Sequence, residues 1–314
     1  PIPVRPTPAE EAIFAEIAEV WTHPPAGTKA PTSGSGATLF PWTLFKAALS
    51  SHRALAETVR NRRKSLRGAD GEVADPDRAA EDAALARLGE LAEAVDDRNA
   101  AKLTALVEQL RAIGVDGKGS TRCVVFSERI ATLDWLAEQV PAALGLSTDQ
   151  VRVLHGGMAD VRQMDVIEEF GLRESPVRLL LAGDMASEGV NLHRECHHLI
   201  HFDLPWSLIT IEQRNGRIDR YGQEQPPEIR ALVVTPDAAA GDVRVLTKLL
   251  EREDTAHRAF GESGALLGLH APTLEEEAIA RALRDGVDPD EAIPERPSAE
   301  FDLLTLLTQG TGTG

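Results

Sequence analysis

The stretch EQRNGRIDRYGQ, from Glu212 to Gln223, carries the strongest structural signal in the chain. At about 3.6 residues per turn, Gln213, Arg217 and Arg220 fall on one stripe of a helix, at positions i, i+4 and i+7. We therefore expect a helix over Leu208–Arg220. A guanidinium group is a planar fork that stays charged, so the stripe suits a site where charge develops on a phosphoryl group.

The same stretch resembles the last core motif of Swi/Snf-type superfamily 2 helicases and DNA translocases, which reads roughly Q-x-x-G-R-x-x-R-x-G-Q. The matching positions are Gln213, Gly216, Arg217, Arg220, Gly222 and Gln223. Further blocks occur upstream in the family's order, at Val124–Glu128, Leu154–Met158, Asp184–Leu192 and Phe202–Trp206. The resemblance covers about a third of the chain, and it is greatest to the bacterial branch that includes a polymerase-recycling translocase.

The resemblance implies a fold and a set of roles. The fold is α/β, a RecA-like parallel-sheet lobe of the P-loop NTPase type that lacks its own P-loop. Arg217 and Arg220, with Gln213, would be the catalytic residues that reach across a cleft to ATP, as arginine fingers do. In the segment after the predicted strand Val177–Ala182, Ser187 would contact a strand phosphate. The nucleotide would be contacted by Glu188, Gly189 and Asn191.

No P-loop occurs in this sequence. Gly114–Ser120 looks similar, but Lys118 is followed by Gly119 instead of the hydroxyl residue that G-x-x-x-x-G-K-[ST] requires, so we interpret it as a turn before a strand. ATP and magnesium would then be bound mainly by a missing N-terminal RecA-like lobe of the same protein. We expect the chain, which begins at Pro1, to be a piece of a longer protein and to be inactive alone.

Two segments are candidates for contact with nucleic acid. His155, Gly156 and Gly157 follow a predicted strand, and glycines let backbone amides approach a phosphate closely; an ordinary tight turn is the alternative. Arg60 and Lys64 lie on one face of a predicted helix that is dense in cations, which favours contact with duplex DNA. A solvated helix face is the alternative there.

Charge and composition limit the function further. The chain has 314 residues, 42% of them hydrophobic, and no apolar run near the length of a membrane span. Cys123 and Cys196 are its only cysteines, and no secretory signal precedes the first helix, so we expect a cytoplasmic protein with no membrane partner. The net charge of −17 argues against tight DNA binding by this chain alone.

Hydrophobic patterning divides the chain into three parts. Residues 1–119 show only helical patterns and loops, and residues 120–235 alternate short apolar strands with helices, which is typical of a parallel sheet covered on both faces. Residues 236–314 carry 16 acidic against 7 basic side chains, and we expect a helical extension that ends in a disordered tail.

A histidine-rich segment offers an alternative chemistry. Its potential ligands lie within nine residues, at His193, Cys196, His197, His198 and His201. Zinc favours four such ligands, but these straddle a predicted strand whose side chains alternate between faces, so we predict a buried strand and no metal.

Two other functions fit parts of the sequence. The chain would be a stand-alone interaction module if it kept the lobe only as a scaffold and held a protein partner through its N-terminal helices or acidic tail. It would be a nucleic-acid-binding domain without motor function if it bound DNA by itself in a salt-dependent way.

Overall fold

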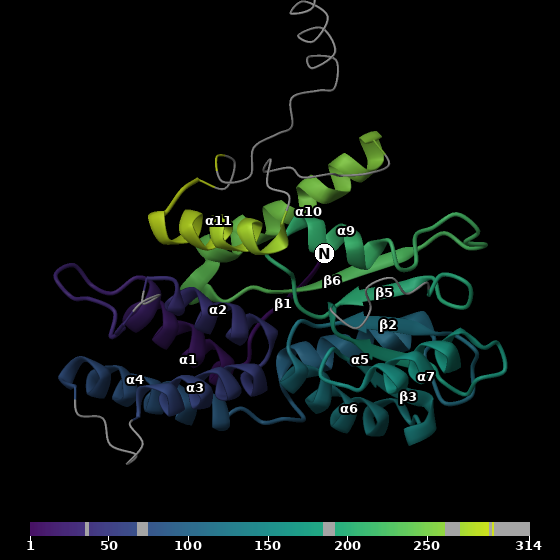
Figure 1. The fold of residues 1–314 in the computed structure, drawn as a ribbon, viewed down its shortest axis with the longest axis horizontal. Coiled ribbons are helices and arrows are strands. Elements are labelled where there is room, and N and C mark those ends of the chain that lie inside the picture. The colour runs from purple at the N-terminus through teal and green to yellow at the C-terminus, as the bar shows by residue number, and fades with distance from the viewer. Residues whose placement is uncertain (35–37, 68–74, 185–191, 261–270, 289–290, 292–314) are drawn as a thin grey trace, which may run out of the picture.

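A single sheet organises the chain in the computed structural model, which describes residues 1–34, 38–67, 75–184, 192–260, 271–288 and 291. Among these residues, the sheet has six strands, all parallel, in the order β1-β6-β5-β2-β4-β3 (Figure 1). The strands are β1 Ile2–Val4, β2 Cys123–Phe126, β3 Val151–Leu154, β4 Leu179–Ala182, β5 His198–His201 and β6 Glu228–Val234. The predicted α/β class with a parallel sheet is confirmed.

Both faces of the central strands are buried because β2 lies between β4 and β5. Val124 pairs with Leu180 on one side and with Leu199 on the other. Side chains alternate between the faces of a strand, so Val124 and Phe126 join one apolar cluster and Cys123 and Val125 join another. This is why the near-continuous apolar runs in the sequence predicted strands so well.

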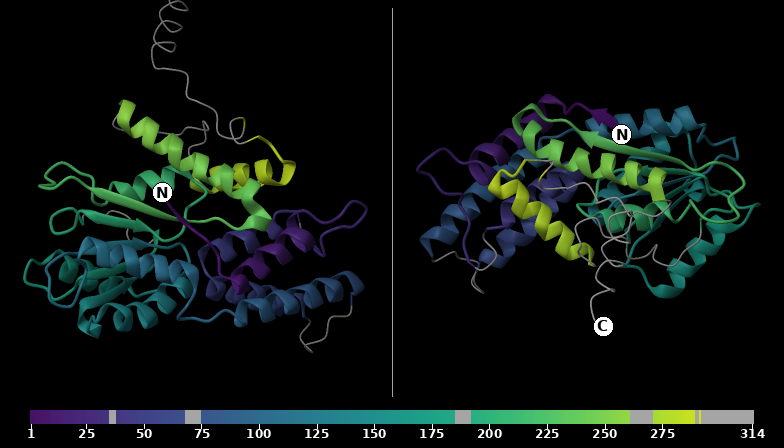
Figure 2. Two further views of the ribbon diagram at one scale, coloured as in Figure 1. Left: turned by 180° about the vertical axis from the view of Figure 1, so that it is seen from behind. Right: turned by 90° about the horizontal axis from the view of Figure 1, so that it is seen from above.

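Helices cover the two faces of the sheet, and the helices of the first third of the chain lie to one side of it, as Figures 1 and 2 show. α6 packs on β3 and β4, and α5 packs on α6, β1 and β6. α7 packs on β3. The helices are α1 Pro8–Glu16, α2 Phe40–Ser50, α3 His52–Leu66, α4 Pro76–Glu93, α5 Ala101–Ile113, α6 Ile130–Leu144, α7 Asp160–Gly171, α9 Leu208–Asn215, α10 Ala240–Phe260 and α11 Pro272–Asp285. A π-helical segment, Ile17–Thr22, continues α1.

Local sequence explains several helix ends. The Thr7 hydroxyl accepts from the Glu10 amide while the Glu10 carboxylate accepts from the Thr7 amide, a capping box that starts α1. The Ser51 hydroxyl accepts from the Ala54 amide and caps the start of α3. Gly114 ends α5 at a φ of 87°, a conformation that glycine adopts at little cost.

The first third of the chain is not wholly helical, and that prediction was wrong. Ile2–Val4 forms β1, which pairs in parallel with Leu232–Val234 of β6 and closes that edge of the sheet. A strand of three residues is too short to show a periodic pattern, and its partner lies far along the chain.

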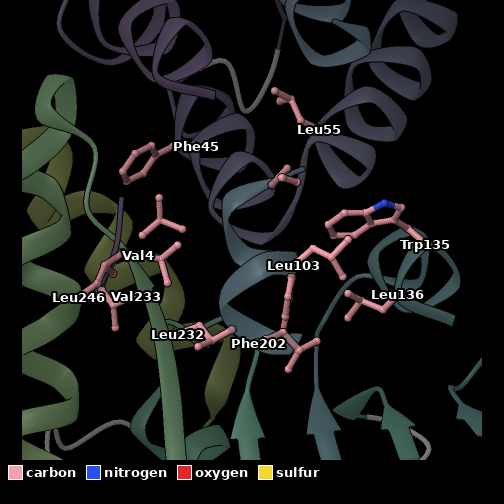
Figure 3. Packing of buried hydrophobic residues seen from close by; sticks show 14 of the residues in the cluster. Val4, Phe45, Leu55, Leu103, Trp135, Leu136, Phe202, Leu232, Val233 and Leu246 are labelled. Carbon is pink, nitrogen blue, oxygen red and sulfur yellow. The ribbon is translucent and has the colours of Figure 1, made fainter. Parts of the chain in front are cut away.

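One apolar cluster runs through all three predicted parts of the chain. Figure 3 shows Val4 of β1, Phe45 of α2 and Leu246 of α10 on one side of this cluster, and Leu103 of α5 and Trp135 of α6 on the other. Burial of each such side chain contributes about 1.5–3 kcal/mol. The division at residues 119 and 235 stays a prediction, while the core that the three parts share joins them in one structure.

Candidate functional site

Loops at the carboxyl ends of the strands line a cleft of about 830 Å³. In open α/β sheets, ligands bind at this edge, near the point where the connections from two neighbouring strands leave in opposite directions. Residues that follow β2, β3 and β4 contribute to it, together with α9 and α11. The lining includes Lys46, Glu128, Arg129, His155, Gly156, Gly157, Asp160, Gly183, Asp184, Thr210, Gln213, Arg214, Arg217, Pro272 and Glu276.

The turn His155–Gly157 lies between β3 and α7, as predicted. The Gly157 amide donates to Nδ1 of His155 at 3.1 Å. A Cβ added to Gly157 would lie 3.1 Å from the same nitrogen, so glycine permits the imidazole to fold back over the turn. Both glycines are exposed at the cleft, where their backbone is open to a ligand.

The helix predicted over Leu208–Arg220 ends at Asn215, and that prediction was wrong in its second half. Gly216 follows, and the chain continues in tight turns through Arg220. Glycine has low helix propensity, and the Cβ of any larger residue here would lie 3.3 Å from the Glu212 carbonyl oxygen. The i, i+4, i+7 stripe therefore does not form.

Gln213, Arg217 and Arg220, the residues of the predicted stripe, differ in how exposed they are and in whether they line the cleft. Gln213 is exposed on α9, and Arg217, just beyond the helix, is half-buried; both line the cleft. Arg220 is exposed and is not among the residues that line the cleft.

The most buried charge at the cleft belongs to Arg214, which is 1% exposed. Its Nε donates to Oδ1 of Asp184 at 2.6 Å, and its Nη2 donates to Oδ2 at 2.9 Å. Its Nη1 donates to the Asp203 carbonyl oxygen at 2.9 Å. Burial alone would lower the pKa of Arg214, but Asp184 and then Asp203 raise it, so the guanidinium stays charged.

Asp203, which follows β5, connects the sheet to the helices of residues 1–119. Its Oδ2 accepts from the hydroxyls of Ser50 at 2.7 Å and Ser127 at 2.6 Å, and its Oδ1 accepts from the Glu128 amide at 3.1 Å. Burial raises the pKa of this carboxyl, but Arg214 and Lys102 outweigh burial and the net pKa is lowered. A charged carboxylate thus fixes the end of β2 against the end of α2.

A second buried cation lies beneath the same network. Lys102 of α5 donates from Nζ to the Leu49 carbonyl oxygen at 2.8 Å and lies 4.2 Å from the centre of the Phe202 ring. Burial lowers the pKa of Lys102 to about 8.

The rim of the cleft carries an ion-pair triad from three parts of the chain. Nζ of Lys46, on α2, lies 2.9 Å from Oε2 of Glu128 and 2.9 Å from Oε2 of Glu276 on α11. Burial raises the pKa of Glu128 to about 7, against the opposing effect of Lys46. The triad ties α2, the end of β2 and α11 together.

Other predicted site residues lie elsewhere or outside the described residues. Ser187, Glu188, Gly189 and Asn191, predicted to contact strand phosphate and nucleotide, lie outside the described residues. Arg60 and Lys64 are exposed and line a separate groove of about 710 Å³ between α3 and α4.

That groove is the more basic of the two sites. Arg63 and Arg67 line it with Arg60 and Lys64, and both pair with Asp82 of α4. Among the described residues, neither Arg60 nor Lys64 has a carboxylate within ion-pair distance.

The histidine-rich segment packs as part of the sheet. The His197 and His198 rings lie 3.9 Å apart, and His201 is buried with its Nε2 2.9 Å from Oδ1 of Asn215. Burial, followed by the nearby Arg214, lowers the pKa of His201 to about 3. Within the described residues, no three His, Cys, Asp or Glu side chains gather in a way that could hold a metal ion.

Sequence reasoning missed Arg214 and Asp203, although a signal for Arg214 existed. Arg214 stands three residues after Ile211 and four before Ile218, so it shares the buried face of the helix. A buried guanidinium needs hydrogen-bond acceptors, and a carboxylate is the strongest of these. For Asp203 no comparable signal exists, because its partners come from residues 50, 102 and 127.

Comparison with known proteins identifies the central region. Residues 101–222 match the family described as the helicase conserved C-terminal domain. The chain is 25% identical over 270 residues to an uncharacterized ATP-dependent helicase, YqhH, of Bacillus subtilis, covering 85% of this chain and 42% of that protein. It is 30% identical over 198 residues to the RNA polymerase-associated protein RapA of Vibrio campbellii, covering 62% of this chain and 19% of that protein.

Solved structures show the same fold. The C-terminal part of the Fun30 ATPase domain matches with a TM-score of 0.54 at 16% identity, over 90% of this chain and 95% of that one. The SWI2/SNF2 ATPase core domain of Sulfolobus solfataricus matches with a TM-score of 0.52 at 14% identity, over 95% of this chain and 48% of that one. The fold is therefore that of the RecA-like lobe of such ATPase cores, as expected. The chain spans less than half the length of YqhH and of RapA.

Within the described residues, no helix is both long and apolar enough to cross a membrane.

Proposed function

We propose that this chain, whose residues 101–222 are a helicase conserved C-terminal domain, is the second motor lobe of a Swi/Snf-type ATP-dependent translocase that moves along duplex DNA. One observation carries the proposal. Gln213 and Arg217 line the same cleft as the turn His155–Gly157, at the carboxyl edge of the sheet. An arginine and an exposed glycine turn in one open cleft suit a site that is completed by a second lobe.

In this proposal Arg217 acts as an arginine finger on ATP bound by the missing lobe. Charge that develops on the transferred phosphoryl group would be neutralised when the two lobes close, so that hydrolysis would be coupled to motion. Arg214 and Asp184 would hold the end of α9 rigid, because their bidentate contact fixes the residue three positions before Arg217. Arg220 lies outside the cleft lining, so we propose that it acts on the same nucleotide only after the lobes have closed.

Magnesium would be held by the missing lobe. Proteins hold Mg²⁺ through one or two carboxylates together with the phosphates of the substrate, so in this proposal the metal would lie with the nucleotide on the lobe that carries the P-loop. We therefore assign no step on this chain to the metal.

Two surfaces of the chain would contact the DNA track. The Gly156 amide would bind strand phosphate beside the cleft, and the Gly157 amide would do so after releasing Nδ1 of His155. Ser187 would contact strand phosphate from the segment outside the described residues. Arg60 and Lys64 would add backbone contacts from the α3–α4 groove, where their charges have no carboxylate partner among the described residues.

The decisive variant is Arg217→Ala in a polypeptide extended upstream through a P-loop lobe. DNA-stimulated ATP hydrolysis should fall by about 10³- to 10⁵-fold, as for other arginine fingers. The ATPase activity of Arg217→Lys should also be low, because lysine keeps the charge but not the planar fork. Arg98→Ala, an exposed arginine before α5, is the matched control and should be unchanged. Activity of Arg217→Ala within twofold of wild type would refute the finger.

A further inference from the structure

The start of α9 is held by a carboxylate from the C-terminal segment. Glu275 of α11 is fully buried, and its Oε2 accepts from the Ser207 hydroxyl at 2.8 Å and from the Ile209 amide at 3.2 Å. The Ser207 hydroxyl in turn accepts from the Thr210 amide at 3.2 Å. Two of the amides that a helix leaves unsatisfied at its start are thus bound by a cap built from two distant segments.

The chemistry of this cap makes it a strong anchor. The positive end of a helix dipole favours a carboxylate, and burial removes the water that would compete for it. The other oxygen of Glu275, Oε1, is buried and has no hydrogen-bond partner among the described residues. The buried acid is therefore stabilised mainly by its contacts with the start of α9.

The neighbouring residue ties the same helix to the rim of the cleft. Glu276 of α11 lies 2.9 Å from Nζ of Lys46, and Glu276 and Pro272 line the cleft. α11 thus meets α9 through Glu275 and α2 through Glu276. The views in Figures 1 and 2 show α11 lying beside α10, on the side of the sheet where α9 lies.

We propose that Glu275 is a positioning residue, which sets the place of α9 and thereby of the cleft residues Gln213 and Arg217. α9 has only eight residues, and Gln213 lies about 9 Å along it from Ser207, at about 1.5 Å per residue. A helix this short behaves as a rigid rod, so the cap at its start and the Arg214–Asp184 contact near its end together set the position of the cleft residues. The part of this inference that concerns Arg217 as an arginine finger rests on the proposed function. The anchoring of α9 by Glu275 is independent of that function.

The anchoring is tested on this chain by amide hydrogen exchange. Glu275→Ala should speed exchange of the α9 amides about 2- to 30-fold while α7 stays unchanged; that range corresponds to about 0.5–2 kcal/mol for a lost cap. Glu275→Gln should speed exchange less than Glu275→Ala, because an amide oxygen can still accept both bonds while the charge that the helix start favours is lost. Glu277→Ala is the matched control, since Glu277 is exposed on the same helix and, among the described residues, pairs only with Arg281.

Ser207→Ala gives an independent measurement should Glu275→Ala fail to fold. It should produce the same change confined to α9, and combining it with Glu275→Ala should add less than the sum of the two single effects. Exchange that rises equally in α7 and α9, or additive effects of the two substitutions, would overturn the inference.

Activity separates the anchoring from the proposed function. In the polypeptide extended through a P-loop lobe, Glu275→Ala should lower kcat for ATP hydrolysis at least fivefold and change KM for ATP less than twofold, because the nucleotide is bound by the other lobe. An unchanged kcat beside the faster α9 exchange would refute positioning of the cleft residues. A wild-type polypeptide without ATPase activity would refute the proposed function and leave the exchange result standing.

Discussion

Arg214→Met gives the most direct test of the buried charge network at the cleft. The substitution keeps a similar volume but removes the partner of Asp184 and Asp203. Asp203 has little access to water, with a side chain that is 6% exposed. Of its partners in the described part of the chain, it would keep Ser50, Ser127, the Glu128 amide and the more distant Lys102.

The structure sets the expected size of the loss. Removing one partner of a buried ion pair costs about 3–5 kcal/mol, because it leaves a charge that is neither hydrated nor paired. Asp184 is 28% exposed, so water relieves part of its cost, and we expect a value near the lower limit, about 3 kcal/mol. A domain is stable by about 5–15 kcal/mol, so the variant should still fold.

Equilibrium unfolding in urea measures this loss. Tryptophan fluorescence is a suitable probe because all four tryptophans, Trp21, Trp42, Trp135 and Trp206, are buried. Agreement with the transition seen by circular dichroism would justify a two-state free energy. Arg98→Met should change stability by less than about 0.5 kcal/mol, as expected for an exposed site.

The network also predicts that two substitutions within it are not additive. Combining Arg214→Met with Asp184→Asn should cost less than the sum of the two single losses, because Asp184→Asn removes one of the charges that Arg214→Met leaves unpaired. A loss below about 1 kcal/mol for Arg214→Met, or strict additivity, would show that the contacts do not stabilise the site.

Two further predictions concern pH and salt. The pKa of Glu128 is raised to about 7, so the folded state holds its proton more tightly and the stability that this provides is lost as pH rises. The excess stability of wild type over Glu128→Gln should therefore fall by about 2 kcal/mol between pH 5 and pH 7.5 in urea titrations, and a constant difference would contradict the pKa. For DNA binding by the longer polypeptide, replacing both Arg60 and Lys64 by alanine should make the slope of log K against log salt less steep by about 2, whereas Arg98→Ala should not change it. An unchanged slope would remove the α3–α4 groove from the DNA interface.

The strands of the sheet could be predicted because their signal is local. Cys123–Phe126 and Val151–Leu154 are short apolar runs between polar turns, and the structure places β2 and β3 at these residues. The start of α3 is encoded just as locally, since the Ser51 hydroxyl caps the amide of Ala54, three residues later.

Features that depend on distant partners could not be predicted. β1 exists because Ile2–Val4 meets the edge of β6, more than 220 residues later. The network at Asp203 gathers side chains from α2, α5, the residue after β2 and α9, and the anchor at Glu275 joins two helices. Nothing in the local pattern at Glu275 separates it from its neighbours Glu276 and Glu277.

The helix that carries the cleft residues was misjudged for a different reason. Ile218 continues the helical spacing of Ile211 and is buried, so the apolar pattern appears unbroken. The structure buries the two residues in different apolar clusters, with the turn at Gly216 between them. The burial pattern was therefore predicted correctly, but it did not reveal that the helix ends before Gly216.

The central claim is that this chain is half of a motor, and ATP hydrolysis tests it most directly. Turnover should be measured for this chain, with and without duplex DNA, beside the polypeptide extended upstream through a P-loop lobe. The account predicts no turnover by this chain and DNA-stimulated turnover by the longer polypeptide. Hydrolysis by this chain alone, or none by the longer polypeptide, would contradict it.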